Sequence, residues 1–128
     1  MRLLLDTHIL IWALALPDHL SPRARAYLDD SENTVMASLV STWEIAVKRS
    51  VHADSIPIPA ADIPLLCAES GIDLLTIRPK HIELVESLPF HHQDPFDRLL
   101  IAQAMIEPLR LLTHDHALAA YGSSVIVV

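Results

Sequence analysis

The segment that decides the fold is RLLLDTH, residues 2–8. Its largely apolar run ends at Asp6, which is typical of a strand buried on both faces within a parallel sheet. Apolar residues then recur at helical spacing from Ile9 until Pro17. A buried strand that leads directly into a buried helix predicts the first unit of an α/β fold, with Asp6 at the carboxyl end of the strand.

The same alternation of strand and helix continues along the chain. We expect further strands at residues 34–37, 74–77, 109–113 and 125–128. We expect helices at residues 9–16, 22–30, 38–49, 62–70, 79–88, 96–106 and 115–120, with a loop over most of 52–64. This alternation favours a parallel sheet that is covered by helices on both faces. No linker or repeat divides the sequence, so residues 1–128 are predicted to form one domain.

Composition and charge narrow the classes of protein. With 52% hydrophobic and 20% charged residues, the chain has enough apolar material for a core and is not intrinsically disordered. The net charge of -7 argues against a generic basic nucleic-acid-binding protein, although a bound cation could still make contact with phosphate. The 2 glycines exclude a glycine-rich phosphate-binding loop, and the single cysteine excludes an internal disulfide.

The apolar N-terminal region resembles a signal peptide only superficially. Asp6 and His8 interrupt it, and neither apolar piece is long enough to span a bilayer. We therefore expect a cytoplasmic protein without a membrane-spanning segment.

Two aspartates follow strands of the predicted sheet. Asp6 ends the first strand, and Asp115 comes two residues after the strand at 109–113. Both belong to the carboxyl edge of the sheet, which is where open parallel sheets bind ligands. For Asp6 the alternative is an ordinary role as the N-cap of the following helix.

Glu44 lies in the helix predicted over residues 38–49, among apolar neighbours, which is unusual for a glutamate. We expect Trp43, Ala46 and Val47 to point inward from this helix. The alternative for Glu44 is a pair with Lys48, four residues later, on a solvated face.

Asp94 and Asp97 lie in the segment HHQDPFDR, residues 91–98. Asp94 followed by Pro95 is typical of a helix N-cap with proline in the first turn, and we treat Asp94 as a cap. Asp97 falls in the same first turn, where a helix N-terminus stabilises negative charge.

Asp6, Glu44, Asp97 and Asp115 thus come from separate segments that meet at one edge of the predicted sheet. Four carboxylates in a partly dry cleft repel one another strongly unless cations lie between them. Oxygen ligands select Mg²⁺ or Mn²⁺, which activate water and neutralise a phosphodiester. The histidines lack the spacing of a zinc site. The residues therefore predict metal-dependent phosphodiester hydrolysis.

Four segments also carry a resemblance to a known family. They are LLLDTHILIWAL (3–14), SLVSTWEIAVK (38–48), HHQDPFDRLLIAQA (91–104) and LLTHD (111–115). In their order and spacing they resemble the PIN-domain ribonucleases, and among these the VapC-type toxins of type II toxin–antitoxin pairs. The resemblance implies a three-layer α/β/α fold around a central parallel sheet.

The resemblance further implies an acidic site that binds one or two Mg²⁺ or Mn²⁺ ions. The family's four acids and two neighbouring hydroxyls correspond by motif to Asp6, Glu44, Asp97, Asp115, Thr7 and Thr113. Family members cleave RNA, commonly tRNA or rRNA, are inhibited by a cognate VapB-type antitoxin and often form homodimers. We expect such an antitoxin to place a basic tail in the acidic cleft and an apolar helix near residues 57–64.

Two other interpretations remain open from the sequence. The first is a catalytically silent PIN-like module that binds RNA or a partner, although all four acids are present. The second is a receiver-type phosphoacceptor domain, which is also a small parallel α/β fold with clustered aspartates. Receiver domains carry an aspartate after the third strand and a lysine after the fifth, whereas here the third strand leads into Arg78 and Pro79.

Overall fold

The computed structural model describes residues 1–128 and contains one five-stranded sheet whose strands are all parallel. The strands are β1 (Arg2–Leu5), β2 (Thr34–Ser38), β3 (Asp73–Leu75), β4 (Arg110–Thr113) and β5 (Val125–Val127). Their order across the sheet is β3-β2-β1-β4-β5, which differs from the β2-β1-β3-β4-β5 order of receiver-type folds. The chain builds outward from β1 in one direction and then in the other, so a topological switch point lies between β1 and β4.

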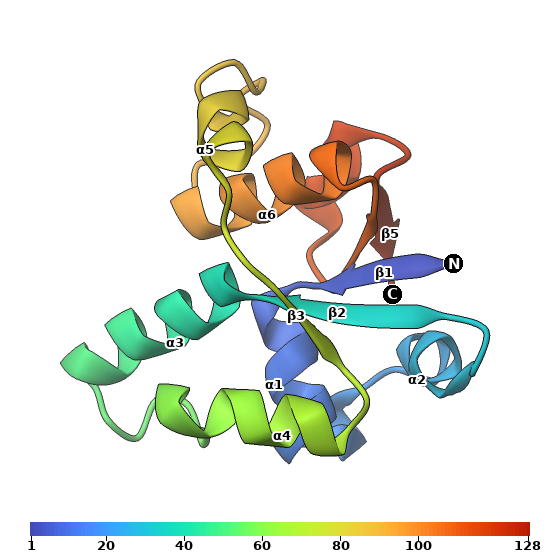
Figure 1. Cartoon of the computed structure of the whole chain (residues 1–128), viewed down its shortest axis with the longest axis vertical. Helices are drawn as coiled ribbons and strands as arrows, with labels where there is room; N and C mark the ends of the chain where they lie inside the picture. Colours follow the sequence, from blue (N-terminus) through green and yellow to red (C-terminus); the bar gives the residue numbers. More distant parts are fainter.

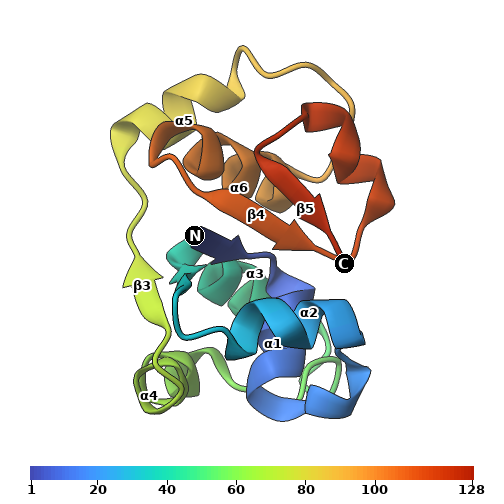
Figure 2. The same ribbon diagram turned by 90° about the vertical axis from the view of Figure 1, so that its right-hand side faces the viewer.

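Helices cover both faces of this sheet. The α-helices are α1 (Thr7–Ala15), α2 (Pro22–Asp29), α3 (Leu39–Val51), α4 (Ile63–Glu69), α5 (Pro79–Val85) and α6 (Pro95–Ile106), and the 3-10 helices are η1 (Pro17–His19), η2 (Ala60–Asp62) and η3 (His116–Tyr121). Figures 1 and 2 show α5 and α6 on one face and α1, α2 and α4 on the other. The predicted three-layer α/β/α architecture is confirmed. None of the helices combines the length and the apolar character that crossing a bilayer requires.

Alternate residues of β1 enter two separate cores. Leu3 and Leu5 belong to the core that includes α1 and α4, whereas Leu4 belongs to the core built around α6. Successive side chains of a strand point to opposite faces, so a strand between two helical layers must be apolar at every position. This is why the uninterrupted leucine run of residues 3–5 marks the centre of the sheet.

The register of β1 and β4 brings together the first residues of the candidate site. Leu5 pairs with Leu112, so Asp6 and Thr113 lie side by side at the edge of the sheet. The backbone N–H of Asp6 donates to the carbonyl of Leu112 at 3.0 Å, which extends the pairing to this edge.

The strand predicted at 74–77 is shorter and begins earlier, at Asp73. β3 is an edge strand that pairs only with β2, and its last pair is Leu75 with Ser38. Because β2 ends at Ser38 and α3 begins at the next residue, residues 76–77 have no neighbouring strand to pair with. The length of β3 is therefore determined by its partner rather than by its own β propensity.

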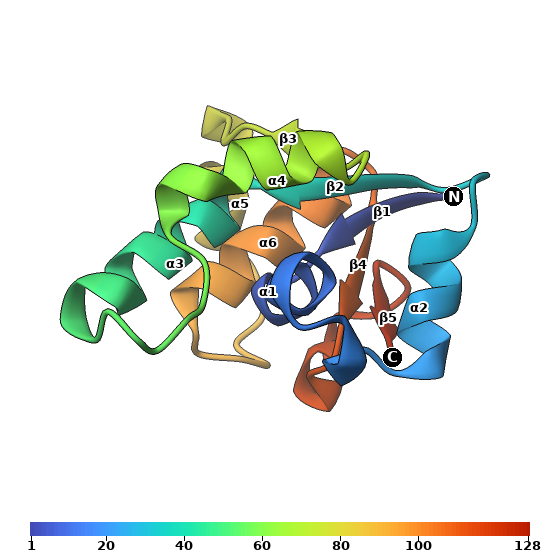
Figure 3. The same ribbon diagram turned by 90° about the horizontal axis from the view of Figure 1, so that it is seen from below.

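The expected inward face of α3 is wrong. Trp43 is 50% exposed, and Ala46 and Val47 are exposed as well. The buried positions are instead Val40, Ser41, Glu44 and Ile45, one helical turn apart. The Trp43 ring packs edge-on against Phe96, with 4.7 Å between ring centroids. Figure 3 shows α3 continuing from the end of β2 beyond the sheet, and its contacts there are with α1, α6 and η2.

Candidate functional site

Asp6 lies at the switch point and is almost completely buried. Its Oδ1 accepts a hydrogen bond from the backbone N–H of Ile9 at 2.9 Å, so it also serves as the N-cap of α1. Its Oδ2 accepts a hydrogen bond from the hydroxyl of Thr113 at the end of β4. Burial raises the pKa of Asp6 above its ordinary value, and these hydrogen bonds oppose that shift.

Glu44 points inward from α3, with both carboxylate oxygens engaged. The hydroxyl of Thr7 donates to Oε1 at 2.6 Å, and the ammonium group of Lys48 donates to Oε2. The Ser41 hydroxyl lies 2.9 Å from that of Thr7 and completes this buried polar group. The pair with Lys48 exists as the alternative interpretation proposed, but Glu44 is buried rather than on a solvated face.

Asp97 occupies the first turn of α6, as predicted, and Asp94 caps that helix. Oδ1 of Asp94 accepts from the backbone N–H groups of Phe96 and Asp97 at 2.8 and 3.1 Å. The pKa of Asp97 is raised to about 6, first by burial and then by the negative charges of Asp94, Glu44 and Asp6, against a lowering by His92. The charges that raise the pKa of Asp97 therefore come from the N-cap of α6, from α3 and from the end of β1.

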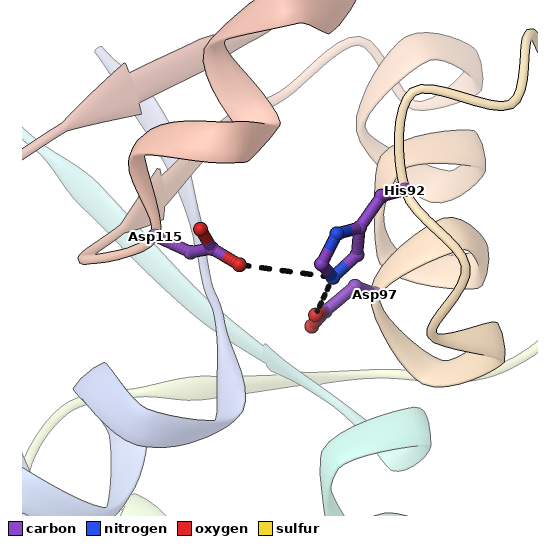
Figure 4. A group of neighbouring side chains, drawn as sticks. All are labelled: His92, Asp97 and Asp115. Atoms are coloured by element: carbon purple, nitrogen blue, oxygen red, sulfur yellow. Dashed lines mark hydrogen bonds and ion pairs between the residues drawn. The ribbon is translucent and has the colours of Figure 1, made fainter.

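His92 lies between Asp97 and Asp115, as Figure 4 shows. Its Nε2 atom is 2.9 Å from Oδ2 of Asp97 and 3.7 Å from Oδ2 of Asp115. One potential ligand atom from each of these three side chains falls within 4.8 Å of the others. Oδ1 of Asp115 accepts from the backbone N–H of Ala117 and thereby caps η3.

The four predicted acids line one cleft of about 550 Å³ at the carboxyl edge of the sheet. The lining residues are Asp6, His8, Trp12, Glu44, Lys48, Asp94, Asp97, His114, Asp115 and His116. Lys48 is the only lysine or arginine among them, so carboxylates dominate the charge of the cleft. Asp97 and Asp115 both lie close to His92 and form a three-residue group with it. Asp6 and Glu44 lie outside that group.

His92 is the residue that sequence reasoning missed. The adjacent pair His91 and His92 matches no spacing of metal-ligating histidines, and nothing local distinguishes the two. In the fold their rings diverge: His91 packs against Tyr121, with 5.0 Å between ring centroids, while His92 reaches the acids. The difference depends on the path of the loop before α6, which no periodicity encodes.

Comparison with known proteins agrees with this architecture. A family model of the PIN domain matches residues 3–123. The fold is similar to a chain in the crystal structure of VapBC2 from Rickettsia felis bound to a DNA fragment from their promoter, with a TM-score of 0.67 and 16% identity over 100% of this chain and 98% of that one. It is also similar to a chain of a toxin–antitoxin complex from Klebsiella pneumoniae, with a TM-score of 0.62 and 20% identity over 97% and 95% of the two chains.

No match to the chain was found among curated proteins. The family model nevertheless spans nearly the whole sequence, and both structural similarities extend over at least 97% of the chain. On this ground, the chain belongs to the PIN domain family.

Proposed function

We propose that the protein is a Mg²⁺- or Mn²⁺-dependent endoribonuclease that acts as the toxin of a type II toxin–antitoxin pair. The observation that carries this proposal is that Asp6, Glu44, Asp97 and Asp115, from four separate segments, line one cleft. Membership of the PIN domain family and the likeness in fold to chains of two toxin–antitoxin complexes support the same function. The sequence resemblance favours tRNA or rRNA as the substrate.

The donor set of the cleft fits a hard divalent cation. Carboxylate oxygens are the ligands that Mg²⁺ and Mn²⁺ prefer, and Asp97 and Asp115 approach each other closely enough to share one ion. The pKa of Asp97 is raised first by burial and then by the neighbouring carboxylates, and a bound cation would offset both effects by stabilising the charged form. When bound, such an ion supplies an activated water and charge neutralisation at the scissile phosphate.

Lys48 and two threonine hydroxyls that contact the carboxylates would position the reacting groups. Thr113 holds Asp6 at the end of β1, and Thr7 and Lys48 hold both oxygens of Glu44. Lys48 is also the one lysine or arginine of the cleft, with a side chain 43% exposed, and is therefore suited to contact an RNA phosphate. Side chains that are held in place before substrate binds lower the cost of reaching the transition state.

Cleavage of RNA by the purified protein tests this function. We expect cleavage with Mg²⁺ or Mn²⁺, none in EDTA, and recovery when either metal is added back. Asp6→Asn removes one charged ligand but keeps the shape of the side chain and should abolish cleavage. Sequencing of RNA 5′ ends after expression of the wild type and of Asp6→Asn would identify the substrate and the cleavage site. RNA that is bound but left intact with both metals would instead identify a silent binding module.

An apolar groove next to the acidic cleft supports a protein partner. It has a volume of about 520 Å³ and lies between α1 and α3, with Ile11, Trp12, Val47 and Val51 among its lining residues. Its lining includes Pro57, the first residue of the region predicted to contact an antitoxin, and the groove shares Glu44 and Lys48 with the cleft. One antitoxin could therefore place an apolar helix in the groove and a basic tail in the cleft.

The proposed substrate and partner are molecules of the cytoplasm, so the function implies a cytoplasmic protein. Because members of the family that the sequence resembles often form homodimers, we also propose that this protein is a homodimer. Light scattering on the purified protein tests that state directly, since a dimer doubles the mass of 14.2 kDa.

A further inference from the structure

We propose that His92 is an additional ligand of the metal site, together with Asp97 and Asp115, and that its nitrogen shifts the preference of the site from Mg²⁺ toward Mn²⁺. The inference rests on the proposed metal-dependent function and names a residue and a metal preference that this function leaves open. It follows from three observations: the position of the ring, the way its loop is held and the chemistry of imidazole.

The ring is placed where a shared ion would bind. Its Nε2 atom lies 2.9 Å from Oδ2 of Asp97 and 3.7 Å from Oδ2 of Asp115, and the three atoms fit within one coordination sphere. Asp97 is in the first turn of α6, and Asp115 follows β4. The ring of His92 therefore lies between two carboxylates that come from different elements. Figure 4 shows the ring directed at both carboxylates.

The loop that carries His92 is anchored by a buried arginine. Arg98 is 4% exposed and has no carboxylate partner; its guanidinium donates instead to backbone carbonyls of the segment before α6. Its contacts are the carbonyls of Val85, Leu88, Pro89 and His92 at 3.0 to 3.5 Å, the hydroxyl of Tyr121 at 3.2 Å and the ring of Phe90 at 4.0 Å. Arg98 follows Asp97 directly in α6. The first turn of this helix therefore carries the carboxylate of Asp97 and also the guanidinium that holds the loop of His92.

A nitrogen in this ligand set distinguishes the two metals. Mg²⁺ favours oxygen ligands in strict octahedral geometry. Mn²⁺ is a softer transition-metal ion and accepts an imidazole nitrogen more readily than Mg²⁺ does. For Nε2 to bind a metal, it must carry no hydrogen, and the hydrogen of the neutral ring must be on Nδ1. If His92 only oriented Asp97 by a hydrogen bond, its removal would weaken both metals equally.

Metal titrations of the full-length protein test the proposal without RNA. Mn²⁺ binding is measured by electron paramagnetic resonance of the free ion, and Mg²⁺ binding by its competition with Mn²⁺. In His92→Asn we expect a loss of about 10-fold or more in Mn²⁺ affinity, with a much smaller change for Mg²⁺ because the amide offers an oxygen instead. His91→Asn is the matched control, and both affinities should stay at the wild-type values.

Three outcomes would overturn the proposal. Equal losses for both metals would leave His92 as a positioning residue, and unchanged affinities would remove it from the site. A wild-type protein that binds neither metal would overturn the proposed function as well, so the two failures are distinguishable. If His92→Asn does not fold, pulsed spectroscopy of wild-type protein with bound Mn²⁺ decides, since the absence of a histidine nitrogen coupling contradicts ligation.

Discussion

The hydroxyl of Thr7 donates a 2.6 Å hydrogen bond to Oε1 of Glu44 and thereby connects the first turn of α1 with the middle of α3. Both residues are at most 3% exposed. A buried carboxylate is costly unless its oxygens have partners, so this bond explains how α3 can turn a glutamate toward the interior.

Replacing Thr7 by valine tests the bond. We expect Thr7→Val to lower the free energy of unfolding by about 1–3 kcal/mol, because Oε1 of Glu44 loses its donor in a buried place. Cleavage should fall with it, since Glu44 is no longer held. Thr7→Ser keeps the hydroxyl and is the control, and urea denaturation compares the three proteins. Equal stability of the valine and serine variants would contradict the role of this bond.

Asp6 combines a charge at the cleft with the N-cap of α1, and two substitutions separate these roles. Asparagine is as good an N-cap as aspartate, so Asp6→Asn should lose cleavage and keep the stability of the wild type. Asp6→Ala should lose cleavage and also about 1 kcal/mol of stability, because the N–H of Ile9 loses its acceptor. Thermal melts and RNA cleavage measure the two effects. Near-normal turnover of Asp6→Asn at saturating metal would refute the proposed role of Asp6.

The raised pKa of Asp97 predicts how stability changes with pH in the absence of metal. In the unfolded chain an aspartate titrates near pH 4, whereas in the folded protein the pKa of Asp97 is about 6. Between these values the folded state binds more protons at Asp97. The contribution of this residue to stability is therefore greatest below about pH 4 and falls by up to about 3 kcal/mol as pH rises through about 6.

Asp97→Asn should remove this dependence. With EDTA at pH 7 the variant should be more stable than the wild type, and the difference should disappear near pH 4. Addition of Mn²⁺ should stabilise the wild type more than the variant, because the neutral amide of asparagine is a weaker ligand for the ion than the carboxylate. Denaturation at a series of pH values provides the measurement. A variant less stable than the wild type at pH 7 in EDTA would show that the charge of Asp97 does not lower the free energy of unfolding.

Arg98 should be important for stability although it belongs to no ion pair. Arg98→Met leaves several carbonyls of the segment from Val85 to His92 without a donor, and we expect a loss of about 2–4 kcal/mol. Tyr121→Phe removes the hydroxyl that accepts from the guanidinium and donates to the carbonyl of Pro89, and it should cost about 1–2 kcal/mol. Denaturation curves of both variants test this order, and the reverse order would contradict it.

The apolar groove offers a test of the antitoxin proposal. Val51 lines the groove and is 72% exposed, whereas Leu65 on α4 is 65% exposed and lies outside it. Val51→Asp should weaken binding of the co-expressed antitoxin by about 10-fold or more, as expected when a charge enters an apolar interface. Leu65→Asp should not. Titration calorimetry provides the affinities, and equal effects of the two substitutions would exclude the groove as the binding surface.

Much of the fold could be predicted from local sequence, because each strand and helix carries its own signal. The leucine run of β1 indicates a central strand, since a strand between two helical layers must be apolar on both faces. Residues that follow parallel strands meet at one edge of the sheet, so the shared location of Asp6 and Asp115 also followed from order alone. Asp94 was recognisable as a cap because a cap depends only on its immediate neighbours.

Other features were decided by contacts between distant segments. The helix α3 has apolar residues on several sides, so the periodicity of its sequence could not identify its buried face. Glu44 is buried and Trp43 is exposed because the carboxylate of Glu44 accepts a hydrogen bond from the hydroxyl of Thr7, 37 positions away. The end of β3 depends on where β2 stops. His92 contacts Asp97 and Asp115 from a loop whose carbonyls accept hydrogen bonds from the guanidinium of Arg98. Such contacts form only when the chain packs into its tertiary structure. The residues that they join are not related by the helix or strand periodicity that local sequence displays.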